Sequence, residues 1–157
     1  MTSKGPFIHW SKRIGLDNKE FMMPKFRTMI INTPQISTDK LKNPSKYLTK
    51  IGSFLRNSSL DELPQLWSIL IGYMSFVGPR PALFNQYNLI KLRNENNIFT
   101  LKPGLTGFAQ INGRDDLSDV EKVKLDHYYK INHSNLFDLK IIFLTIYKVI
   151  LKKNVNH

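Results

Sequence analysis

The sequence contains no cysteine, which excludes disulfide bonds and thiolate chemistry and is typical of a reducing compartment. It also lacks an apolar run long and unbroken enough to cross about 30 Å of hydrocarbon, and its polar first residues do not resemble a signal peptide. Histidine is scarce, and no spacing typical of metal ligands connects His9, His127, His133 and His157. We therefore expect neither a disulfide scaffold nor a histidine-based metal centre.

Acidic residues are few: 12 Asp and Glu stand against 23 Lys and Arg, giving a formal charge of +11. Such a surface attracts polyanions, which include nucleic acid, anionic lipid headgroups and phosphorylated substrates. One group of cations lies inside motifs rich in glycine and proline, which favours a phosphate site, and comprises Lys25, Arg27, Arg56, Arg80 and Arg114. A second group interrupts an apolar C-terminal segment, which favours a membrane surface, and comprises Lys140, Lys148, Lys152 and Lys153.

The length of 157 residues and the apolar content of 41% predict one compact domain. We expect an α+β fold, mainly helical, with a few short strands and loops punctuated by glycine and proline. Extended segments are expected at 6–10 and 21–29 around a turn at 16–18, and helices at 50–57, 61–71, 81–92, 118–131 and 136–152. Ser118 and Glu121 have the spacing of a capping box at the start of one helix. Trp10 and Trp67 are expected in the core.

The most informative segment is Ser59-Leu60-Asp61-Glu62-Leu63-Pro64-Gln65-Leu66. Ser59 and Glu62 have capping-box spacing, Pro64 fits only near a helix start, and apolar residues then recur at helical intervals at Leu63, Leu66, Trp67 and Leu70. Asp61 is therefore expected at a helix start, where the backbone N–H groups keep a carboxylate ionised and attract phosphate. Such an aspartate can serve as a nucleophile in phosphoryl transfer. The alternative is that Asp61 and Glu62 only cap a helix.

Four separated segments occur in a recognisable order. They are Lys25-Phe26-Arg27-Thr28-Met29, Gly78-Pro79-Arg80-Pro81, the glycine-rich stretch from Lys102 to Arg114, and Leu125-Asp126-x-Tyr128-Tyr129. Together with the Asp61-Glu62 segment, they resemble the bacterial sugar transferases, the monotopic polyprenyl-phosphate phosphoglycosyl transferases. The resemblance runs from about Gly5 to about Lys152 and implies one catalytic domain over 1–157. Family members carry an N-terminal hydrophobic helix that enters the membrane and turns back, so a shortened form without this helix is expected.

The resemblance implies transfer of a sugar-1-phosphate from a UDP-sugar to polyprenyl (undecaprenyl) phosphate, with release of UMP. This reaction starts the assembly of surface glycans such as lipopolysaccharide O-antigen, capsule or exopolysaccharide. Asp61 would form a phosphosugar-aspartyl intermediate, and Asp61 and Glu62 would hold Mg²⁺, which binds carboxylate and phosphate oxygens together. The sugar cannot be read from the sequence.

The resemblance also suggests binding residues for substrate or phosphate: Lys25, Arg27, Arg56, Arg80, Arg114 and Asp126. Arg80 lies between two prolines that fix its backbone, so its guanidinium can meet phosphate oxygens at little entropic cost. Ion pairs that stabilise the scaffold are alternative roles for Lys25, Arg27, Arg56 and Asp126, and bonding to loop carbonyls is one for Arg80. The implied location is the cytoplasmic face of the bacterial inner membrane, on an anionic surface.

Two other classes of function compete with this hypothesis. A nucleic-acid-binding domain would explain the charge, but no helix-turn-helix, zinc, RRM or KH signature is present, and nucleic acid is not an expected partner. A catalytically silent module that binds a membrane surface would explain the lysines of the C-terminal segment. The presence of Asp61, Glu62 and Arg80 favours an enzyme over both.

Overall fold

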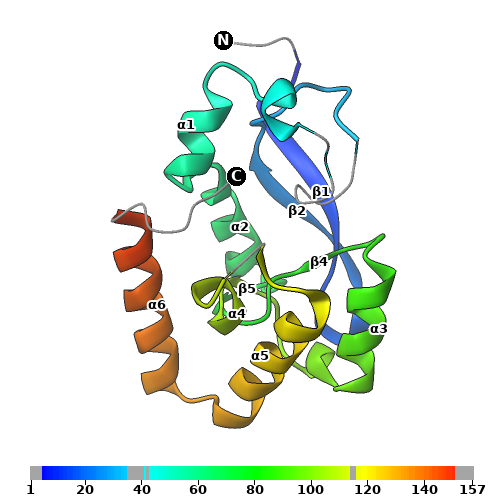
Figure 1. The fold of residues 1–157 in the computed structure, drawn as a ribbon, viewed down its shortest axis with the longest axis vertical. Helices are drawn as coiled ribbons and strands as arrows, with labels where there is room; N and C mark the ends of the chain where they lie inside the picture. Colours follow the sequence, from blue (N-terminus) through cyan, green and yellow to red (C-terminus); the bar gives the residue numbers. More distant parts are fainter. Residues whose placement is uncertain (1–4, 35–40, 42, 114–115, 151–157) are drawn as a thin grey trace.

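The computed structural model describes residues 5–34, 41, 43–113 and 116–150. Its longest strands, β1 (Ile8–Ile14) and β2 (Glu20–Phe26), form an antiparallel hairpin around a 3₁₀ turn at Leu16–Asn18 (Figure 1). Strand β4 (Ala82–Leu83) pairs with the other edge of β1, in the order β2-β1-β4. Pro24, which has no N–H, lies on the edge strand β2, where a sheet tolerates it. The turn at 16–18 and the extended segments before and after it, expected from the sequence, are confirmed, although the first strand runs on to Ile14.

A second, parallel pair of strands joins the two glycine-proline motifs. Strand β3 (Ser75–Val77) pairs with β5 (Gly104–Thr106), and their ends are linked by bonds from Gly78 N–H to the Thr106 carbonyl (2.9 Å) and from Gly104 N–H to the Pro79 carbonyl (3.0 Å). A Cβ atom on Gly104 would collide with the backbone of Gly78. Glycine at 104 therefore lets the two loops touch through their backbones, and this contact holds the loop that carries Arg80.

The helices pack against these strands in two groups (Figure 1). Short helices α1 and α2 stand beside the hairpin, and α3 to α6 gather at the other end of the molecule. The α-helices are α1 (Gly52–Asn57), α2 (Gln65–Leu70), α3 (Tyr87–Glu95), α4 (Phe108–Ile111), α5 (Asp119–Asn132) and α6 (Asn135–Ile150). The remaining 3₁₀ turns are η3 (Pro44–Tyr47), η4 (Leu60–Glu62) and η5 (Ile98–Thr100).

The core consists of three small apolar clusters. One joins β3, α4, α5 and α6 around Tyr129 and the fully buried Ile141. Another joins α3, η5 and α5 around Leu89 and Val123, and the third lies beneath the hairpin around Met23. The fold is α+β, with one domain of helices and a few short strands, as the sequence predicts.

Two expectations about local structure are wrong. The segment after Pro81 is a strand before it becomes a helix, because Ala82 pairs with Ile14 of β1, and α3 begins only at Tyr87. The two capping boxes also differ. Ser118 and Glu121 form one, with Ser118 N–H donating to Glu121 Oε2 at 2.8 Å, whereas Ser59 has a φ of 56° and makes no capping bond with its side chain.

Helix α2 is amphipathic in the opposite sense from an ordinary surface helix. Its buried residues are the polar Gln65 and Ser68, each 1% exposed, and of its apolar residues only Ile69 packs against the core, at the Met23 cluster. Trp67 is 56% exposed and Leu70 77% exposed. The helical spacing of the apolar residues is confirmed, but the expectation that Trp67 lies in the core is wrong, as it is for Trp10, which is 51% exposed.

Candidate active site

Asp61 lies in the 3₁₀ turn η4, between the outward-facing Leu60 and Leu63. The turn points the Asp61 side chain inward, and the residue is only 7% exposed. Burial raises the pKa of this carboxyl, and the charge of Glu62 raises it further, while Lys25, Arg56 and Arg80 act in the opposite direction. The net shift is upward, because burial outweighs the nearby cations. Helix α2 itself begins four residues later, at Gln65.

Three of the expected cations surround Asp61. Arg56, from α1, is 7% exposed, and its Nε donates to Thr28 Oγ1 at 2.9 Å. Lys25, from β2, is partly exposed, and desolvation together with Arg13 and Arg56 lowers the pKa of its amine to about 8, although Asp61 acts in the other direction. Residues from two separated segments of the chain therefore bring positive charge to one carboxylate.

Arg80 contacts the other carboxylate of the pair. Its Nη2 donates to Glu62 Oε1 at 2.6 Å, and the two side chains are 31% and 13% exposed. The backbone of the Arg80 loop is held at successive carbonyls: Arg93 Nη1 donates to the Arg80 carbonyl at 2.7 Å, and Arg13 Nη1 donates to the Pro81 carbonyl at 3.0 Å. These two hydrogen bonds fix the main chain of the loop, and the Arg80 side chain extends from it to Glu62.

Asp126 is not a neighbour of Asp61 in this arrangement. It forms a buried ion pair with Arg93, whose Nη2 and Nε donate to Asp126 Oδ2 at 2.7 and 3.0 Å. Because Arg93 also binds the Arg80 carbonyl, Asp126 acts on the site through two arginines. The helix-anchoring ion pair considered from the sequence is what the structure shows, with α3 and α5 as the helices it joins.

Arg27 lies at the margin of the site. Its Nε donates to the Pro6 carbonyl at 2.6 Å, and its buried Nη1 has no hydrogen-bond partner among the described residues. Arg114 lies outside the described residues.

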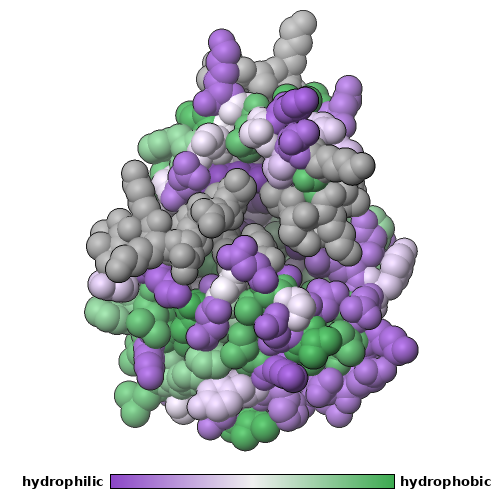
Figure 2. Space-filling view, viewed as in Figure 1, coloured by the Kyte–Doolittle hydropathy of each residue, from purple (hydrophilic) through white to green (hydrophobic). Residues whose placement is uncertain are grey.

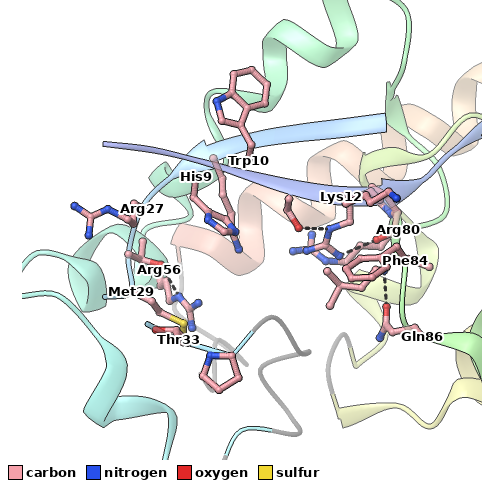
Figure 3. A pocket seen from close by; sticks show the side chains of 18 of the residues that line it. His9, Trp10, Lys12, Arg27, Met29, Thr33, Arg56, Arg80, Phe84 and Gln86 are labelled. Atoms are coloured by element: carbon pink, nitrogen blue, oxygen red, sulfur yellow. Dashed lines mark hydrogen bonds between the residues drawn. The ribbon is translucent and has the colours of Figure 1, made fainter. Parts of the chain in front are cut away.

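A cavity of about 450 Å³, which we call the cationic cavity, lies between the hairpin, α1, the Arg80 loop and α3. Lys25, Arg56 and Arg80 line it, so it adjoins the Asp61 site, although Asp61 itself is not one of its lining residues. Its basic residues are His9, Lys12, Arg13, Lys25, Arg27, Arg56, Arg80, Arg93 and Lys122. In Figure 3, His9 and Arg56 project toward the same hollow from different elements, Arg80 lies across from them near Phe84, and Trp10 points to the other side of β1. A cavity so rich in cations suits a ligand with several phosphate charges.

Sequence reasoning missed three residues of this cavity: His9, Arg13 and Arg93. Burial, followed by the charges of Lys25, Arg13 and Arg27, lowers the pKa of His9, which disfavours its charged form. Arg93 could have been suspected, because it follows the buried Leu89 by four residues and so falls on the inward face of α3. A charged residue at such a position needs an opposite charge, and Asp126 occupies the equivalent place on α5.

The fold and this site define a class of protein. The bacterial sugar transferase family matches residues 1–152, and the chain belongs to this family. The resemblance stated from the motifs is therefore confirmed.

Individual relatives are also similar over nearly the whole chain. A UDP-glucose:undecaprenyl-phosphate glucose-1-phosphate transferase of Klebsiella pneumoniae is 44% identical over 98% of this chain, and a protein with the same description from Escherichia coli K12 is 41% identical over 98%. The chain spans about a third (34%) of the length of these two relatives. An uncharacterized sugar transferase of Bacillus subtilis, EpsL, is 42% identical, and there the match covers 96% of this chain and 73% of the relative.

Proposed function

We propose that this chain transfers a sugar-1-phosphate from a UDP-sugar to a polyprenyl phosphate such as undecaprenyl phosphate, releasing UMP. The observation that carries the proposal is the buried Asp61 carboxylate, which feels the charges of Lys25, Arg56 and Arg80, three residues that line the cationic cavity. Phosphoryl transfer depends on positioning and on neutralising the charge of the transferred group, and this arrangement supplies both. The Klebsiella pneumoniae and Escherichia coli relatives are transferases of the same kind, with UDP-glucose as the donor.

The proposed reaction has two displacements at one phosphorus atom. An Asp61 carboxylate oxygen attacks the phosphorus that bears the sugar, the anhydride bond to the other phosphate breaks, and UMP leaves with the bonding electrons. A phosphate oxygen of the acceptor then attacks the same phosphorus. The aspartyl–phosphorus bond breaks, Asp61 is regenerated, and the product is a polyprenyl diphosphate sugar. Covalent catalysis of this form divides one difficult transfer into two easier ones.

The cations have distinct tasks in this scheme. Lys25 and Arg56 stabilise the ionised form of Asp61 against its burial, and they neutralise the phosphate that approaches it. Arg80 holds the phosphate oxygens, because its guanidinium lies where the cavity meets Glu62 and its backbone is fixed on both sides by Arg93 and Arg13. Asp126 positions Arg93 and does not contact substrate in this scheme.

Magnesium fits the two adjacent carboxylates. The charge of Glu62 raises the pKa of Asp61, so the two groups repel each other, and a divalent cation would relieve that repulsion. Among the described residues, no group of three or more His, Cys, Asp or Glu side chains could hold a metal, so substrate phosphates and water would complete the coordination. Mg²⁺ is commonly bound in this way. Asp61 and Glu62 would hold it, and its charge would neutralise the phosphates.

The outward-facing apolar residues suit the surface of an anionic membrane. They gather on α2, β3 and α6 and include Leu66, Trp67, Leu70, Phe76, Leu139, Phe143 and Ile146, all more than 40% exposed. In Figure 2, apolar side chains gather on the side of α6 and hydrophilic ones on the side of α3. No helix of the described residues is long and apolar enough to cross a membrane. We propose that this apolar face rests on the cytoplasmic face of the bacterial inner membrane, where surface glycans such as lipopolysaccharide O-antigen, capsule or exopolysaccharide are started.

The test is a screen of UDP-sugars for UMP release in the presence of a short-chain polyprenyl phosphate and Mg²⁺. At least one UDP-hexose should support turnover, and the sugar phosphate should appear on the lipid. Asp61→Asn is the matched control, because asparagine has the same shape and keeps the fold. If no UDP-sugar gave UMP, or if a folded Asp61→Asn protein released UMP as fast as the wild type, the proposal would be wrong.

A further inference from the structure

A second pocket opens beside the cationic cavity. It has a volume of about 280 Å³ and lies between η4, α2, β3, β5, α4 and α6. Its walls are mainly aliphatic, and they include Leu63, Leu66, Leu105, Ile111, Ile142 and Ile146. We call it the apolar pocket.

Several polar groups of this lining are satisfied within the protein, whereas the Gln110 amide, at the wall shared with the cationic cavity, has no hydrogen-bond partner among the described residues. The Thr106 and Thr145 hydroxyls bond to each other at 2.7 Å, and Lys148 Nζ donates to the Ile111 carbonyl. Away from Gln110 and Arg80, a ligand in this pocket is therefore offered mainly apolar surface. Such a lining favours a hydrocarbon chain over a sugar or a nucleotide.

The apolar pocket and the cationic cavity share a wall. Arg80 and Gln110 line both, and Glu62, the partner of Arg80, lines the apolar pocket. Cationic charge and hydrocarbon surface therefore meet at Arg80. Leu66 and Ile146, which line the pocket, also belong to the outward apolar face, with exposures of 43% and 53%.

We propose that the apolar pocket binds the first isoprene units of the acceptor lipid and so places the lipid phosphate beside Arg80, within reach of the phosphorus carried on Asp61. The proposal rests on the proposed function and specifies where the second substrate binds. One ligand fits both features, an anionic head at Arg80 and an apolar tail between α2 and α6. Entry from the outward apolar face lets the remainder of the chain stay in the membrane.

The proposal predicts how the affinity for an isoprenoid phosphate depends on the length of its chain. Each isoprene unit that leaves water for the pocket should tighten binding by about tenfold or more, until the pocket is full. Beyond that length, further units should add little in dilute, micelle-free solution. Inorganic phosphate, which offers only the head, should bind far more weakly than farnesyl phosphate.

The experiment measures dissociation constants for inorganic phosphate and for geranyl, farnesyl and geranylgeranyl phosphate below their micelle-forming concentrations. Leu66→Ser is compared with Leu70→Ser. Both are leucines on the exposed face of α2, one helical turn apart, and only Leu66 lines the pocket. Leu66→Ser should weaken farnesyl phosphate binding about tenfold and leave phosphate binding unchanged. Leu70→Ser should bind both ligands as the wild type does.

Two outcomes would overturn the assignment. One is a wild-type protein that binds farnesyl phosphate no better than phosphate. The other is a Leu70→Ser protein that loses as much affinity as Leu66→Ser, since this would indicate general contact with lipid and not a pocket. Neither depends on turnover, so a failure of the proposed function appears separately, as a protein that binds the isoprenoid phosphate in this pattern and releases no UMP from any UDP-sugar.

Discussion

Two carboxylate–arginine pairs lie close together in this protein, and they differ mainly in their exposure to solvent. Glu62 and Arg80 meet at 2.6 Å with side chains 13% and 31% exposed, whereas Asp126 and Arg93 meet at 2.7 Å with side chains 2% and 3% exposed. A buried pair cannot lose one partner without leaving an unsolvated charge, so it has a structural role and does not exchange partners. A pair at a cavity wall can exchange its partner for an incoming phosphate.

The two pairs are also mechanically connected. Arg93 donates to the backbone carbonyl of Arg80, so the buried pair holds the main chain of the residue whose side chain belongs to the open pair. In the proposed function, the same chemical groups thus serve stability in one place and ligand binding in the other. Changes at the two pairs should separate accordingly into effects on unfolding and effects on turnover.

Chelation should have the largest effect, and it should act on turnover and not on the stability that the buried pair provides. Excess EDTA should abolish UMP release, because the charges at Asp61 and Glu62 then lack the cation that neutralises the phosphates, and Mg²⁺ should restore it. The urea midpoint of the protein should not change, because the buried pair needs no metal. Glu62→Gln should be severely impaired even with Mg²⁺ present. Full turnover in excess chelator would remove the metal from the account.

Substituting Arg80, the arginine of the partly exposed pair, should have the next largest effect. Arg80→Ala should lower kcat/KM for UMP release by about a thousandfold, since an arginine on a transferred phosphoryl group contributes on this order. Its unfolding free energy should stay within about 1 kcal/mol of the wild type, because partly exposed ion pairs contribute little to stability. Arg80→Lys is the matched control and should recover part of the activity. A loss of less than tenfold in Arg80→Ala would show that Arg80 does not hold the phosphate.

The buried pair should behave in the opposite way. Arg93→Met leaves Asp126 charged and unpaired, and should lower the free energy of unfolding by about 3–5 kcal/mol. The double variant Arg93→Met/Asp126→Leu should recover most of this stability, because no buried charge remains. Its turnover should remain below that of the wild type, since the Arg80 carbonyl has lost its donor. Urea unfolding and UMP release measure the two effects. If the double variant recovered turnover fully, Arg93 would have no positioning role.

The smallest expected effect is a change in pH dependence. Lys25 is charged below its pKa of about 8 and neutral above it, so activity that needs this charge should fall as the pH rises through about 8. Asp61 must be ionised, and burial raises its pKa, so the acid side of the kcat/KM profile should lie above the usual range for an aspartate. Lys25→Arg keeps its charge and should retain activity on the alkaline side. An unchanged alkaline limb would exclude Lys25 as its cause.

Local chemistry made part of this structure predictable. The turn at 16–18, the capping box at Ser118 and the length of α5 follow from short-range signals, and each is present. The grouping of Lys25, Arg56 and Arg80 about Asp61 was expected from the motif resemblance and not from spacing alone.

Other features depend on contacts that no single segment encodes. Periodicity gave the spacing of the apolar residues on α2, but it carries no information about which side faces the interior, and there the buried side is polar. The strand at Ala82 exists because β1 offers an edge to pair with, which outweighs the helical pattern after Pro81. Arg93 and Asp126 are 33 residues apart in the sequence, and only the packing of α3 on α5 brings them together.

The central claim is that Asp61 carries the sugar phosphate between the two substrates, and intact-protein mass spectrometry tests it most directly. Wild-type protein is mixed with a UDP-sugar that supports turnover, without acceptor, and quenched in acid. A mass increase equal to one sugar phosphate should appear together with one equivalent of UMP. The adduct should vanish on addition of farnesyl phosphate, and it should be absent from Asp61→Asn. Turnover with no adduct in the wild type, together with intersecting rather than parallel initial-rate plots for the two substrates, would contradict the claim and indicate direct attack by the lipid phosphate.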